Sequence, residues 1–187
     1  MAITTAMCNS FKQELLGGVH DLDTDSLKLA LIKASPSGTY NASTTNYSDV
    51  TGNSDEASGT GYSAGGQVLD GATISLDGST AIVDFTDEVF ADVTVSADGC
   101  IIYNTAASNA AIAVIDFGGT VSATAGDLTI EFPAADASSA NMLEHRWQRM
   151  RLRHVQLRRR LMLECEREPH LQVCTAVSSA VLLFLTY

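Results

Sequence analysis

One serine and three aspartates are the residues whose spacing could support chemistry in this chain. Ser63 lies in Gly61-Tyr-Ser-Ala-Gly65, which matches the G-x-S-x-G pattern of a hydrolase nucleophile elbow. That elbow must join a strand to a helix, and it needs a histidine later in the chain as its base. The following residues, Gln67–Ser75, have an extended pattern, and the later histidines all lie beyond residue 142. The pattern favours a glycine-rich bend before a strand, with a Ser63 hydrolase as an alternative.

The three aspartates are Asp21, Asp23 and Asp25, which alternate along the chain as the first ligands of a calcium loop do. The sixth position of such a loop requires glycine and here holds Ser26, and the twelfth holds Ile32 instead of glutamate. An EF-hand is therefore excluded. A looser calcium site, as in a calcium-dependent adhesion module, stays an alternative to a solvated acidic turn, and we predict no metal and no cofactor.

Cysteine and histidine are too sparse to suggest another site. The four cysteines stand in unrelated contexts without C-x-x-C spacing, so neither a zinc site nor a redox motif is predicted. Cys100 lies in an apolar run and is expected to be a core residue. His20 is the only histidine before residue 142, where arginine does not occur. We therefore expect no catalytic residues and no enzyme activity.

Charge divides the chain into two parts. The residues before Leu143 include three lysines and 18 acidic residues, for a net charge of −15, whereas the rest holds eight arginines and four glutamates, for +4. All 14 glycines also lie in the first part. One folding unit rarely divides its composition so sharply, so we predict an acidic body, residues 1–141, and an arginine-rich extension, residues 142–187. The charge of the body argues against nucleic acid or an anionic membrane as its partner.

Periodicity predicts a short helix followed by many short strands. The helix covers Met1–Leu16 and ends at Gly17-Gly18, since glycine commonly follows a helix. At the centre of the chain, Cys100–Tyr103 and Ala111–Phe117 flank the polar break Asn104–Asn109, which indicates a hairpin. A long polar loop, Ala34–Gly61, is expected to hold a short strand near Tyr47–Thr51 and to be functional or mobile.

The expected strands lie at the spacing of a β-sandwich or barrel. Asp77-Gly78 and Asp98-Gly99 are the strongest turn signals, and Gly118-Gly119 is a weaker one, because glycine supplies the positive φ of tight turns. We predict a mainly β protein, an antiparallel β-sandwich of the immunoglobulin-like or jelly-roll-like kind. Its strands are Leu27–Lys33, Val68–Asp70, Thr73–Leu76, Thr80–Phe85, Val89–Ser96, Cys100–Tyr103, Ala111–Phe117 and Asp127–Phe132.

Residues 1–141 resemble a family of small virion structural proteins of tailed bacteriophages. The segments that carry the resemblance follow in order through the body: TTAMCNSFKQELLGGVHD, LKLALIK, SGTGYSAGGQVL, GCIIYN and AVIDFGG…SATAGDLTIEFPAADAS. The resemblance implies a decoration or cement protein on the outer capsid surface, or alternatively a tail or fibre-associated component. It implies the major capsid protein or other virion proteins as partners, a homo-oligomer, assembly in the host cytoplasm and location in the virion.

The extension departs from the family, whose members end soon after the counterpart of Ala134–Ala140 in a short strand-like finish. Four interpretations remain open: a helix that oligomerises or packs on the body, an arginine-rich arm for nucleic acid, a membrane segment, or a shifted reading frame or added sequence without an evolved role. Ala176–Leu185 is much shorter than the ~20 residues of a span. A helix through about Glu164 is indicated by a heptad-like seam of Leu143, Trp147, Met150, His154, Leu157 and Leu161.

Overall fold

The computed structural model describes residues 2–133, 135 and 183–185. It is mainly β, with antiparallel sheets and a short N-terminal helix, as predicted. One sheet has the strand order β1-β7-β6-β2-β3 and the other the order β4-β5-β8. The elements are β1 (Ala6–Met7), α1 (Asn9–Leu16), β2 (Leu27–Lys33), α2 (Ser48–Gly52), β3 (Gln67–Val68), β4 (Thr73–Asp77), β5 (Thr80–Asp84), β6 (Glu88–Asn104), β7 (Ala110–Ile130) and β8 (Leu183–Leu185).

The hairpin of β6 and β7 is the centre of the fold, as its sequence predicts. Asn104 pairs with Ala110 at its closed end, and the turn between them contains Ser108 and Asn109 with positive φ. The Asn104 Oδ1 accepts hydrogen bonds from the backbone N–H groups of Ala106 and of the next residue, at 2.9 and 3.3 Å. A polar side chain that bonds the backbone of its own turn fixes that turn locally.

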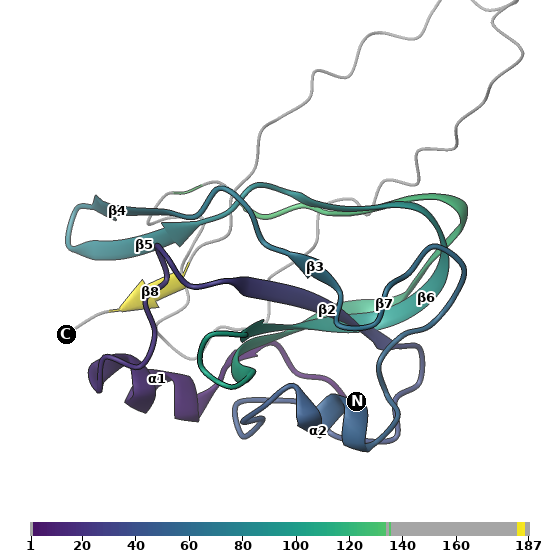
Figure 1. Cartoon of the computed structure of the whole chain (residues 1–187), viewed down its shortest axis with the longest axis horizontal. Coiled ribbons are helices and arrows are strands. Elements are labelled where there is room, and N and C mark those ends of the chain that lie inside the picture. Colours follow the sequence, from purple (N-terminus) through teal and green to yellow (C-terminus); the bar gives the residue numbers. More distant parts are fainter. Residues whose placement is uncertain (1, 134, 136–182, 186–187) are drawn as a thin grey trace, which may run out of the picture.

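Two of the predicted turns are wrong, because the chain continues as a strand through both. Asp98-Gly99 lies inside β6 and Gly118-Gly119 lies inside β7. Ala97 pairs with Val121 and Gly99 pairs with Asp116, so Asp98 faces four residues of β7, Phe117–Thr120. Extra residues on one strand bend the ladder, and Figure 1 shows both strands curving back at the right-hand end of the molecule.

Gly99 is needed for close approach of two strands and not for a turn. A Cβ at this position would lie 2.3 Å from the carbonyl oxygen of Ile115 on the paired strand. The predicted strands on either side of each glycine motif are therefore parts of one long strand. By contrast, Asp77-Gly78 does form the predicted turn between β4 and β5, with Gly78 at a φ of 61°.

The burial pattern of β6 and β7 changes at the bend. The residues of the closed half, 99–104 and 110–115, are all buried, including Cys100 as predicted. Beyond the bend, inward residues such as Val93 and Val95 alternate with exposed ones. A strand that is covered on both faces is apolar throughout, whereas one that is covered on one face alternates. In Figure 1 the helices lie below the sheet and the curved halves of β6 and β7 lie above it, which gives the closed half its two covers.

The N-terminal helix is shorter than the predicted Met1–Leu16. The Thr4 N–H donates to the Tyr40 carbonyl oxygen at 2.8 Å, and Ala6–Met7 forms β1 against β7. These pairings satisfy backbone groups that a longer helix would have used internally. Within α1, Phe11 is fully buried, and the helix ends at Gly17-Gly18 as predicted.

Most of the extension 142–187, including its predicted helix, lies outside the described residues. Its described part is β8, which pairs with β5 in antiparallel register. Among the residues that the structure describes, no helix combines the length and apolar character needed to cross a bilayer.

Glu88, the first residue of β6, should make stability depend on pH. Burial, assisted by the charge of Asp70, raises the pKa of Glu88 to about 7. A raised folded-state pKa gives stability that is complete below the ordinary value of 4.5 and is lost as the pH rises through 7. The uncharged variant Glu88→Gln is therefore expected to raise the urea midpoint at pH 8 and to leave it unchanged at pH 4. An equal change at both pH values would contradict this assignment.

Candidate functional site

The structure places Ser63 on an exposed turn instead of a nucleophile elbow. The turn is closed by a hydrogen bond from Gly66 N to Ser63 O at 3.0 Å, and it leads into β3 and not into a helix. The glycines around it have a packing role. A Cβ at Gly59 would lie 1.8 Å from the Thr94 carbonyl oxygen of β6, and a Cβ at Gly66 would lie 1.9 Å from that of Leu29 in β2. The glycine-rich segment thus packs closely against the backbone of two neighbouring strands, β6 at Gly59 and β2 at Gly66.

The three alternating aspartates belong to a hydrogen-bonded turn. The Asp25 Oδ2 accepts from the Asp21 N–H at 2.9 Å and from the Asn104 Nδ2 at 2.6 Å. The Asp21 Oδ1 accepts from the Asp23 N–H at 3.2 Å. The two bonds to the Asp25 carboxylate, first that from the Asp21 N–H and then that from the Asn104 side chain, hold the pKa of Asp25 below its ordinary value. Within the described ranges, no three His, Cys, Asp or Glu side chains are grouped as a metal site requires.

His20, the histidine of the body, is buried and has both ring nitrogens engaged. The orientation of Asn104 follows from its Oδ1, which accepts from the Ala106 N–H, so its Nδ2 faces Asp25 and His20. That Nδ2 donates to the His20 Nδ1 at 3.0 Å, which leaves the His20 Nε2 as the donor to Glu14 at 2.9 Å. A histidine that is held in this way joins α1 to the turn of the central hairpin.

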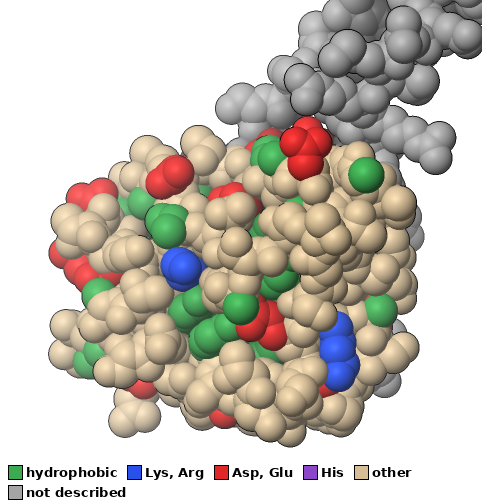
Figure 2. Space-filling model, turned by 45° about the vertical axis from the view of Figure 1, so that its right-hand side comes forward, with side chains coloured by type: hydrophobic (Ala, Val, Ile, Leu, Met, Phe, Trp, Pro, Cys, Tyr) green, Lys and Arg blue, Asp and Glu red, His purple; other side chains and the backbone are tan. Residues whose placement is uncertain are grey.

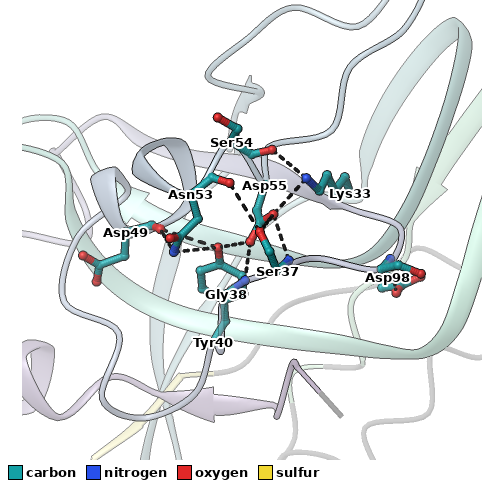
Figure 3. Close-up of polar contacts among 10 residues, drawn as sticks. Lys33, Ser37, Gly38, Tyr40, Asp49, Asn53, Ser54, Asp55 and Asp98 are labelled. Carbon is teal, nitrogen blue, oxygen red and sulfur yellow. Dashed lines mark hydrogen bonds and ion pairs between the residues drawn. The ribbon is translucent and has the colours of Figure 1, made fainter.

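Asp55 organises the first half of the long loop from inside the protein (Figure 3). Its side chain is fully buried. The Oδ1 accepts from the Ser37 N–H at 3.0 Å and from the Ser37 hydroxyl at 2.8 Å, and it lies 3.0 Å from the Lys33 Nζ. The Oδ2 accepts from the Gly38 N–H and from the Tyr40 hydroxyl, both at 2.6 Å. One carboxylate therefore ties β2 to two separate stretches of the loop.

The charge on Asp55 is stable because its partners outweigh the cost of burial. Burial acts to raise the pKa of Asp55, but the hydrogen bonds from Tyr40, Ser37, Gly38 and Lys33 hold it well below its usual range. A carboxylate that accepts several hydrogen bonds keeps its charge even when it is buried. For Tyr40, burial and the bond to Asp55 raise the pKa to about 12, so its hydroxyl remains a donor near neutral pH.

The predicted strand near Tyr47–Thr51 is wrong, because Ser48–Gly52 forms the helix α2. Two polar side chains start it. The Asn46 Oδ1 accepts from the Ser48 N–H at 2.9 Å, and the Asp49 Oδ2 accepts from the Thr45 N–H at 2.8 Å. Side chains that bond nearby backbone in this way favour a turn or a helix start over a strand.

Glu56 organises the second half of the loop. Its Oε2 accepts from the Tyr47 hydroxyl, and its Oε1 accepts from the Tyr62 hydroxyl at 3.0 Å and from the Gly65 N–H at 2.6 Å. The Tyr103 hydroxyl donates to the Gly65 carbonyl oxygen at 2.7 Å, and its ring stacks on that of Tyr47 at a centroid distance of 4.4 Å. Burial raises the pKa of all three tyrosines, that of Tyr103 to about 12, so each hydroxyl keeps its proton.

Asp55 and Glu56 can serve different parts of the loop because they are adjacent in an extended segment. The Lys33 N–H donates to the Asp55 carbonyl oxygen, and the Ala57 N–H donates to the Leu31 carbonyl oxygen, so this segment pairs with the end of β2. Successive side chains of an extended segment point to opposite sides. The two neighbouring carboxylates therefore join six residues of the segment 35–65, between Ser37 and Gly65, in one hydrogen-bonded arrangement.

The outer side of this loop forms the candidate binding surface, defined here as the exposed polar residues Ser35, Thr39, Thr51, Ser54, Ser58 and Thr60. Figure 2 turns this end of the molecule toward the viewer. Most of the face is tan, the colour of uncharged polar side chains and backbone, with a group of hydrophobic side chains near its centre and scattered charges. Hydroxyl groups that are held on a fixed backbone provide hydrogen bonds without an ordering cost on binding.

The residues that build this surface were not found by sequence reasoning. Asp55 and Glu56 carry no motif, and their partners are distributed from Lys33 to Tyr103. The available signal was weak: two adjacent acids in a segment that is otherwise rich in small polar residues, with three tyrosines nearby.

Comparisons with known proteins found no match to this chain. No protein-family model matches the chain, and no curated protein or solved structure was found to match it.

Proposed function

We propose that this chain is a structural protein of a tailed-bacteriophage virion that binds the outer capsid surface as a decoration protein. The observation that carries the proposal is the hydrogen-bonded loop 35–65, whose exposed side is lined with hydroxyl groups while its two carboxylates face inward. This arrangement suits recognition by shape and hydrogen bonds. The resemblance of residues 1–141 to virion proteins of this class supports the same role.

Binding of many copies to a repetitive shell would allow a surface with only weak polar contacts to hold the protein on the capsid. A capsid presents the same binding site many times, so the contacts of linked copies act together and a weak single contact suffices. The body charge of −15 also disfavours nucleic acid as a competing partner. The partner expected from this chemistry is the major capsid protein, with copies of this chain bound as a homo-oligomer.

The role can be tested by electron microscopy of particles that are assembled with and without the protein. We expect density on the outer capsid that is lost when the gene is deleted and is restored by adding the purified chain. Lower resistance of the depleted particles to heat is expected as well. Density at the tail, or unchanged capsid density and heat resistance, would contradict the proposal.

A further inference from the structure

The outer edge of β5 is covered by the C-terminal end of the chain. On one side β5 pairs with β4, and on the other it pairs with β8, with Ala81 opposite Leu185 and Val83 opposite Leu183. In the described residues, β8 is the only strand on that side of β5. An uncovered strand edge is a template for pairing with other chains.

An apolar groove lies beside this edge. A cavity of about 390 Å³ separates the end of α1 and the turn after it from the β4–β5 hairpin. Its apolar lining includes Leu15, Leu22, Ile74 and Val83. With β8 paired to β5, Ile74 is still 58% exposed, and Leu76, which lies on the same face of β4, is 70% exposed. Neighbouring apolar groups in water mark a surface that is built to be covered.

We propose that the β5 edge and this groove form a strand-acceptor site whose occupant is the C-terminal segment of the same chain. That segment ends in Ala-Val-Leu-Leu-Phe-Leu-Thr-Tyr, and its described part, Leu183–Leu185, is the strand on β5. Strand addition supplies affinity through backbone hydrogen bonds, and apolar neighbours add burial. The proposal does not depend on the virion role.

Charge and length both favour this occupant. The extension carries +4 and the body −15, so the two attract each other. Between Ala135 and Leu183 the chain has 47 residues, which at about 3.3 Å per extended residue are more than enough to return to the body. The docked segment covers an edge that would otherwise be available for association between copies.

Disulfide trapping in the full chain tests the pairing. Ala81→Cys and Leu185→Cys stand opposite each other, and Cys165→Ser and Cys174→Ser remove the thiols of the extension, while Cys8 and Cys100 are buried. We expect mild oxidation to yield a disulfide within one chain, detected as a monomer on non-reducing gels and by mass spectrometry. The pair Ser79→Cys and Leu185→Cys is the out-of-register control and should link at least tenfold more slowly. A disulfide-linked dimer, which would mean a second copy as occupant, or no link at all, would overturn the proposal.

A second variant tests the groove. Ile74→Asp in the trapping chain is expected to slow disulfide formation by roughly tenfold, because a charge beside an apolar segment lacks a partner. Val68→Asp is the matched control, since Val68 is a 42% exposed apolar residue of β3 in the other sheet. Equal rates in the two variants would overturn the groove as part of the site.

Discussion

Replacing Asp55 with asparagine is expected to lower the free energy of unfolding by about 3–5 kcal/mol. The amide matches the carboxylate in size but presents a donor group where the protein already supplies donors. One of its two ends must face either the Gly38 N–H and the Tyr40 hydroxyl or the Ser37 N–H and Lys33. Urea denaturation followed by circular dichroism measures the change.

Asp23→Asn is the matched control for this variant, because Asp23 is exposed. We expect its effect to stay within about 0.5 kcal/mol, as for most surface substitutions. Similar losses in the two variants would show that the Asp55 network does not stabilise the loop.

Asp55 also gives the protein an acid-sensitive element. Its folded-state pKa is held low by its hydrogen-bond donors, so its contribution is complete above the ordinary aspartate value of about 3.9 and is lost as the pH falls toward the folded value. Between pH 5 and pH 2.5 the wild-type protein is expected to lose more stability than Asp55→Asn does. Parallel pH profiles of the two proteins would contradict the low pKa.

Gly66→Ala is expected to cost on the order of 3 kcal/mol of stability. The added Cβ would lie 1.9 Å from the Leu29 carbonyl oxygen, and the residue has a φ of +67°, which side chains other than glycine rarely adopt. The obstacle is backbone of β2, which cannot rotate away as a side chain could. The glycine-rich segment must therefore leave the sheet or distort it.

Gly52→Ala is the control, since a Cβ at Gly52 in α2 meets nothing within 4 Å. Because alanine is the better helix former, we expect this variant to be as stable as the wild type or slightly more stable. Urea midpoints of both variants decide the question. A neutral Gly66→Ala would remove the packing explanation of the glycine-rich motif.

Local signals predicted the parts of the fold that local chemistry determines. The turn of the central hairpin contains its own hydrogen bonds to Asn104, and the Asp77-Gly78 turn depends on the conformation of its own glycine. The turn predictions failed at Gly99 and Gly118, although a glycine indicated a turn there as it did at Gly78. At Gly99 its cause is a neighbouring strand, and a sequence pattern does not distinguish a turn from a close approach.

The candidate site could not be predicted for a related reason. The role of Asp55 depends on its contacts with Lys33 and Tyr40. That of Glu56 depends on Tyr62 and on Gly65, which Tyr103 also bonds. These partners come close only when the chain folds. The sequence predicted that the long loop is functional or mobile, and in the structure it is held by the buried carboxylate of Asp55 and the half-buried carboxylate of Glu56. Ser63, the residue with the strongest motif, lies at the surface of that loop.

The central claim is that the loop 35–65 is a preformed surface for binding to the capsid. The most direct test is sedimentation of the purified chain with capsids that lack it, for the wild type and for a Thr39→Arg, Thr51→Arg double variant, which alters exposed positions of the candidate binding surface. Ser79→Arg, in the β4–β5 turn, which Figure 1 places at the opposite end of the molecule from α2, is the control. We expect saturable binding of the wild type and the control, and at least tenfold weaker binding of the double variant. Equal binding of all three proteins, or no binding of the wild type, would contradict the account.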